Sequence, residues 1–70
     1  MDTILIADAD LKSRNKLKGL LAENFNIVCV NNGKQAIDVM NNTLIACLIM
    51  DFKLDYLDGF EVMNFMKNRN

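Results

Sequence analysis

Apolar and polar residues alternate along this chain in blocks whose lengths are typical of strands and helices. Three short blocks, at residues 3–7, 26–30 and 44–50, are almost continuously apolar. Apolar runs without alternation, rich in β-branched residues, are typical of strands covered on both faces. We therefore predict three strands at these positions.

The longer blocks carry apolar residues at helical spacing and predict helices at residues 11–24, 33–41 and 60–69. The apolar faces of the first two comprise Leu17, Leu20, Leu21 and Phe25, and Ala36, Ile37 and Met40. The third helix is apolar around most of its circumference, which is typical of a buried helix. Four basic residues of the first helix lie mostly off its apolar face and indicate a solvated surface: Lys12, Arg14, Lys16 and Lys18.

Polar residues mark the boundaries between these elements. Asp10 precedes the first helix and is expected to accept hydrogen bonds from its first N–H groups as an N-cap. The Asn-Asn-Gly sequence at residues 31–33 is expected to form a turn, since Asn and Gly tolerate positive φ.

The β-α-β-α-β-α order predicts a parallel sheet with right-handed crossovers, whose functional residues gather at the carboxyl ends of the strands. Asp8 and Asp51 follow the first and third strands. Two neighbouring carboxylates repel each other, and a divalent cation such as Mg²⁺ would relieve that repulsion. The alternative, equally compatible with the pattern, is that both acids cap the loops that follow them.

Composition narrows the class of protein further. A chain of 70 residues with 51% hydrophobic and 24% charged residues is one small folded domain. Its net charge of −1 and scattered basic residues favour neither nucleic acid nor a membrane surface as a partner. The chain has no apolar run of membrane-spanning length and no signal peptide pattern, so we expect a cytoplasmic protein.

Cysteine and histidine usage excludes a structural zinc site. The chain has two cysteines and no histidine, which is too few ligands. Cys29 and Cys47 lie in predicted strands and are interpreted as small buried hydrophobic residues rather than a disulfide pair.

Three stretches resemble the receiver domain of two-component response regulators: "ILIADAD" at residues 4–10, "NNGKQAIDVM" at 31–40 and "CLIMDFKLDYLDGFEVM" at 47–63. The resemblance covers the N-terminal half of such a domain. It implies that residues 1–70 form a single truncated receiver-like domain. The implied fold is α/β, a three-layer flavodoxin-like (CheY-like) partial fold with parallel strand order 2-1-3.

The resemblance also implies a function. Asp51 matches the residue that accepts a phosphoryl group from a sensor histidine kinase or a phosphotransfer protein. Mg²⁺ would be held by Asp8, Asp51 and the backbone carbonyl of Lys53. Such a domain is a signalling protein and not an enzyme.

The sequence departs from the receiver pattern in three places. Ala9 replaces the second acid of the metal-binding pair, which weakens or abolishes Mg²⁺ binding. Asp55 stands where proline is usual, and residues beyond 70 that would supply a hydroxyl and a lysine are missing. We therefore expect impaired phosphotransfer or, alternatively, a degenerate receiver that acts only in protein interaction. A nucleotide-binding site is disfavoured, because "DADLKS" and not a glycine-rich loop follows the first strand.

Strand order 2-1-3 leaves the third strand at an edge of the sheet. Apolar edge strands promote pairing with another chain. We expect a homodimer through the third strand and third helix, formed by edge pairing or by exchange of these elements. The alternative is that Phe65 of this helix packs against a loop of its own chain.

Overall fold

The computed structural model describes residues 1–51 and 59–69. The elements are β1 (Thr3–Ala7), α1 (Leu11–Leu21), β2 (Asn26–Val30), α2 (Gly33–Asn42), β3 (Cys47–Met50) and α3 (Gly59–Arg69). The predicted alternation of strands and helices is confirmed.

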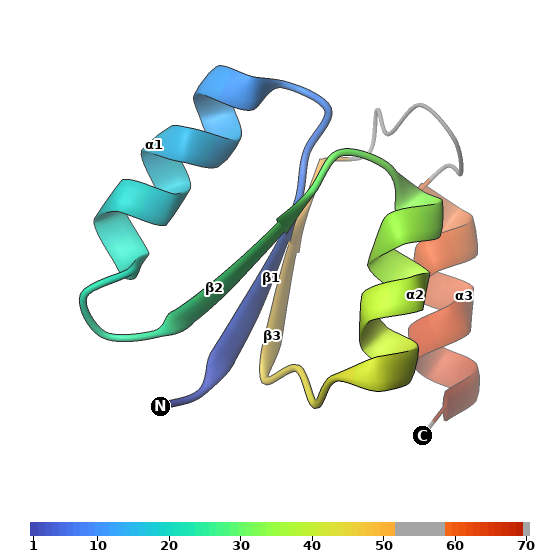
Figure 1. The fold of residues 1–70 in the computed structure, drawn as a ribbon. Helices are drawn as coiled ribbons and strands as arrows, with labels where there is room; N and C mark the ends of the chain where they lie inside the picture. The colour runs from blue at the N-terminus through green and yellow to red at the C-terminus, as the bar shows by residue number, and fades with distance from the viewer. Residues whose placement is uncertain (52–58, 70) are drawn as a thin grey trace.

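The three strands form one parallel sheet in the order β2-β1-β3. Helix α1 lies on one face of this sheet, and α2 and α3 lie together on the other (Figure 1). The chain therefore has the three layers and the strand order that the sequence predicted. The connection from β1 to β2 contains α1, and the connection from β2 to β3 contains α2. Parallel strands need such long crossover connections, which are usually helical.

The hydrophobic core lies between the sheet and the pair α2 and α3. Leu5 and Ala7 of the central strand are completely buried there and pack with Ala36, Met40 and Val62. Ala36 and Met40 lie on the predicted apolar face of α2. Phe65 packs against this core from α3, within its own chain but not against a loop as the alternative had it.

Two predicted boundaries are wrong. Helix α1 ends at Leu21, because the chain turns there: the N–H groups of Asn24 and Phe25 both donate to the carbonyl of Leu21 at 3.1 Å. Strand β3 begins at Cys47, which forms the first pair of the ladder with Ile4 of β1. The three preceding apolar residues, 44–46, lie outside the ladder, and residue 44 is 93% exposed.

The structure corrects three further expectations, two on burial and one on backbone conformation. Leu20 is 69% exposed, although the sequence placed it on the apolar face of its helix. Cys47 is exposed because β3 is an edge strand, whereas α1 packs against β1 and β2. The Asn-Asn-Gly sequence uses no positive φ in the described chain; Asn32 has extended backbone and caps α2 by accepting from the Gln35 N–H at 2.9 Å.

Val62 is the completely buried side chain of α3 in the core, and Phe65 and Met66 of the same helix pack against that core. Val62→Ala is expected to lower the free energy of unfolding by about 2 kcal/mol, because a completely buried side chain leaves a cavity. Met63→Ala is the matched control on the same helix, since Met63 is 46% exposed, and should change stability by less than about 0.5 kcal/mol. Urea unfolding measures both, and equal losses would contradict this packing.

Candidate functional site

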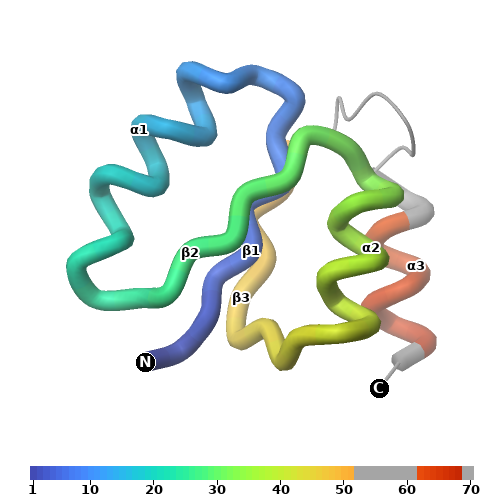
Figure 2. The backbone as a smooth tube through the Cα atoms, viewed as in Figure 1, coloured from blue at the N-terminus to red at the C-terminus, as the bar shows by residue number. Residues whose placement is uncertain are grey.

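The carboxyl ends of the three strands meet at one end of the sheet, where the chain turns from β1 into α1 and from β2 into α2 (Figure 2). Ala7 is in register with Met50, so the residues that follow, Asp8 and Asp51, leave neighbouring strands side by side. The N–H of Asp51 donates to the carbonyl of Ala7 at 3.0 Å. The structure thus brings together the two acids that the sequence singled out, and both are half-buried.

The carboxylate of Asp8 is oriented by the loop that follows β1. Its Oδ1 accepts a hydrogen bond from the N–H of Asp10 at 2.9 Å. The backbone N–H of Asp8 donates to the carbonyl of Val30 at 3.1 Å, which fixes the residue to the end of β2. The loop-capping interpretation of Asp8 is therefore correct for one oxygen, while Oδ2 accepts no hydrogen bond from the described part of the chain.

Asp10 is the N-cap of α1, as predicted. Its carboxylate accepts from the hydroxyl of Ser13 at 2.8 Å and from the N–H groups of Lys12 and Ser13 at 3.4 and 3.3 Å. The Ser13 hydrogen bond is the main cause that lowers the pKa of Asp10 below 3.8, with smaller contributions from the backbone N–H groups and from the positive charge of Arg14. Both carboxylate oxygens of Asp10 are thus engaged in capping α1.

The donor set suits Mg²⁺ only weakly. Ala9 has no oxygen in its side chain, and among the described residues no three acidic or thiol side chains lie close enough to bind a metal ion. Mg²⁺ is nevertheless commonly held by one or two carboxylates and several waters. Asp8 and Asp51 supply that minimum. The third ligand that the resemblance implied, the carbonyl of Lys53, lies outside the described residues, as does Asp55.

One residue of this site, Arg14, is not predicted by the sequence pattern. Arg14 was assigned to a solvated helix face, but it is half-buried, and its Nη1–H donates to the backbone carbonyl of Asp8 at 2.6 Å. Lys12, Lys16 and Lys18 are exposed as expected. The signal for Arg14 was its position one turn after the N-cap, where a long side chain can reach back to the preceding loop.

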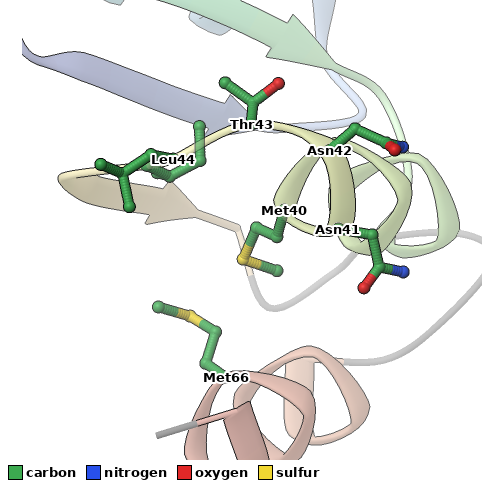
Figure 3. Close-up of a pocket in the computed structure, with 7 residues that line it drawn as sticks. Met40, Asn41, Asn42, Thr43, Leu44 and Met66 are labelled. Atoms are coloured by element: carbon green, nitrogen blue, oxygen red, sulfur yellow. The ribbon is translucent and has the colours of Figure 1, made fainter.

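A hollow of about 360 Å³ lies at the opposite end of β3 and is separate from the acidic site. It is lined by Met40, Asn41, Asn42, Thr43, Leu44, Ile45 and Met66. The side chains of Met40 and Met66 extend into the space between α2 and α3 (Figure 3). Since Asp51 follows the carboxyl end of β3, this hollow contributes nothing to the chemistry of the two acids.

None of the described helices is both long enough and apolar enough to span a membrane.

Comparison with known proteins gives concordant matches. Residues 4–70 match the family model of the response regulator receiver domain. The hydrogenase transcriptional regulatory protein HoxA of Bradyrhizobium diazoefficiens is 26% identical over 65 residues, which make up 93% of this chain and 13% of HoxA. The structure is similar to that of the Francisella response regulator 1452 receiver domain, with a TM-score of 0.91 and 25% identity, over 100% of this chain and 59% of that one. The chain thus spans less than two thirds of either relative.

The lowered pKa of Asp10 predicts a pH-dependent cap. A depressed folded-state pKa contributes stability above the unfolded value near 3.8, and this contribution is lost as the pH falls below that value towards the folded one. Asp10→Ala should therefore lower the melting temperature at pH 7, with a smaller difference from wild type below the folded-state pKa. Asp10→Ser should retain most of the cap at both pH values. Thermal unfolding followed by circular dichroism tests this, and a pH-independent difference would contradict it.

Proposed function

Because this chain belongs to the response regulator receiver domain family, we propose that Asp51 accepts a phosphoryl group from the phosphohistidine of a sensor kinase or a phosphotransfer protein. The observation that carries this proposal is the register of β1 and β3, which sets Asp51 beside Asp8 at the carboxyl edge of the sheet. Aspartate carboxylates act as nucleophiles in phosphoryl transfer, and the backbone of Asp51 is held by the hydrogen bond from its N–H to the carbonyl of Ala7 at 3.0 Å.

In the proposed reaction a carboxylate oxygen of Asp51 attacks the phosphorus in line. The O–P bond forms while the N–P bond to the histidine breaks, and the imidazole nitrogen keeps the electron pair and takes a proton from water. Mg²⁺, when bound, neutralises charge on the transferring oxygens. Asp8 would hold it through Oδ2, since Oδ1 already accepts from the loop. The protein itself ends the step as a phosphoprotein, so it is a signalling domain and not an enzyme.

Ala9 makes this chemistry slow. Its methyl group supplies no charge at the position of the second acid, and Asp10 cannot take over because its carboxylate caps α1. Loss of one charge-stabilising group at such a site costs roughly 10²–10³ in rate. The alternative function, favoured by the same observation, is a degenerate receiver that works in the cytoplasm only as a protein-interaction module.

Phosphorylation of Asp51 is tested with acetyl phosphate and Mg²⁺, followed by intact mass measurement. We expect slow, Mg²⁺-dependent gain of one phosphoryl group in the wild type and none in Asp51→Asn. Asp38→Asn is the matched control, since Asp38 is an exposed acid on α2, and it should react like the wild type.

Ala9→Asp extends the same experiment by restoring the acidic pair. If the missing acid limits the reaction, this variant should be phosphorylated at least ~10-fold faster than the wild type. A folded protein that gains no phosphoryl group, with or without Asp at position 9, would reject phosphotransfer and leave the interaction module.

We also propose that the 70-residue chain forms a homodimer through β3 and α3. Strand β3 is an edge of the described sheet, and residues 44–50 carry no charge that would repel a second copy. Leu44 and Met63 are 93% and 46% exposed, and Cys47 is exposed on the strand itself. Uncharged, exposed edges of this kind favour pairing between chains.

The dimer is tested by light scattering coupled to size-exclusion chromatography, under reducing conditions that prevent a disulfide. Cys47→Lys places a charge on the edge and should weaken association at least ~10-fold. Leu20→Lys is the control, because Leu20 is an exposed residue of α1, away from β3. A wild type that stays monomeric at every concentration would reject the dimer.

A further inference from the structure

We propose that Arg14 is a positioning residue that orients Asp8 for cation binding, an inference that rests on the proposed function. The Arg14 side chain reaches from the first turn of α1 to the carbonyl of Asp8, six residues earlier, at 2.6 Å in a half-buried position. No other described residue of α1 donates a side-chain hydrogen bond to Asp8.

The bond from Arg14 completes a set of restraints on Asp8. Its N–H is held by the carbonyl of Val30, its carbonyl by Arg14, and its Oδ1 by the N–H of Asp10. The connection between β1 and α1 has only three residues, so the orientation of the peptide after Asp8 also sets where the Asp10 N–H points. Arg14 therefore controls which carboxylate oxygen of Asp8 is directed away from the loop.

The same loop is tied to the helix from the other side. The N–H of Arg14 donates to the carbonyl of Asp10 at 3.1 Å, while the Asp10 carboxylate caps the preceding N–H groups. Because the side chain of Ala9 provides no ligand, cation binding depends on Asp8 more than it would with an acid at position 9. An error in the orientation of Asp8 has no second acid to compensate for it.

Positioning and simple charge predict opposite signs, which makes the proposal testable. Arg14 carries a positive charge close to a site for a cation, so its removal on electrostatic grounds alone should tighten metal binding. If Arg14 instead orients Asp8, its removal should weaken binding, since loss of a residue that orients a ligand typically costs about 10-fold or more in metal affinity.

The experiment measures Mn²⁺ affinity in the 70-residue protein by paramagnetic broadening of assigned amide signals around Asp8 and Asp51. We expect about 10-fold weaker binding in Arg14→Ala and recovery to within about threefold in Arg14→Lys, which keeps a donor of similar reach. Lys16→Ala is the matched control, because it removes the same charge from an exposed position of α1 and should bind at least as tightly as the wild type.

A second, metal-free readout is the chemical shift of the Asp10 amide proton, which donates to Oδ1 of Asp8. It should move upfield in Arg14→Ala and return in Arg14→Lys. If Arg14→Ala fails to fold, Arg14→Met replaces it, since Met keeps the bulk of the side chain without a donor. Thermal unfolding establishes that each variant is folded.

The outcomes separate this inference from the function on which it rests. Weaker Mn²⁺ binding and a shifted Asp10 amide, both restored by Lys, uphold it. Metal affinity equal to or tighter than that of Lys16→Ala overturns it, whatever the amide does. A wild type that binds no Mn²⁺ rejects the proposed metal site. The Asp10 amide then tests whether Arg14 positions Asp8. A shift that is unchanged in Arg14→Ala overturns that positioning, and a shift that moves in Arg14→Ala and returns in Arg14→Lys upholds it.

Discussion

The rest of this structure depends on the parallel pairing of β1 with a strand on each side. Leu5 and Ile6 of this central strand are completely buried, so its register is fixed by the core as well as by the ladder. A slip of one residue would turn every side chain to the opposite face of the sheet. The fixed register brings the carboxyl ends of β1 and β3 together. Core packing therefore places Asp8 and Asp51 side by side, independently of any chemistry that the two acids perform.

The three residues of the loop after β1 differ in what they contribute to stability and to the proposed function. Asp10 stabilises the start of α1 and is lost to cation binding, while Ala9 offers nothing to a cation. Asp8 has one carboxylate oxygen hydrogen-bonded in the loop, and the proposed function assigns the other to a cation. Arg14 holds this arrangement from the helix side. In the proposed function Asp8 would be the one acidic ligand from this loop, so its orientation matters correspondingly more.

The sequence predicted the elements well because strands and helices differ in the local pattern of their apolar residues, and helix caps depend on contacts between near neighbours. The Asp10 cap, for example, involves residues only two and three positions away. The predictions from the sequence were wrong where contacts between distant parts of the chain determine the structure. Strand β3 starts at Cys47, in register with Ile4 of β1, and Leu20 is exposed although its helix packs against β1 and β2. Neither fact is contained in the local spacing of apolar residues.

By itself the sequence determined the alternation of strands and helices, the helix cap and the identity of the two acids, since these follow from residue type and spacing. The receiver pattern added the strand order, which the sheet confirms. Only the tertiary structure decided that Arg14 binds the carbonyl of Asp8 and that Cys47 is exposed. The physical reason is that spacing fixes which residues share a face. Which face is covered, and which carbonyl a long side chain reaches, depends on how the elements pack.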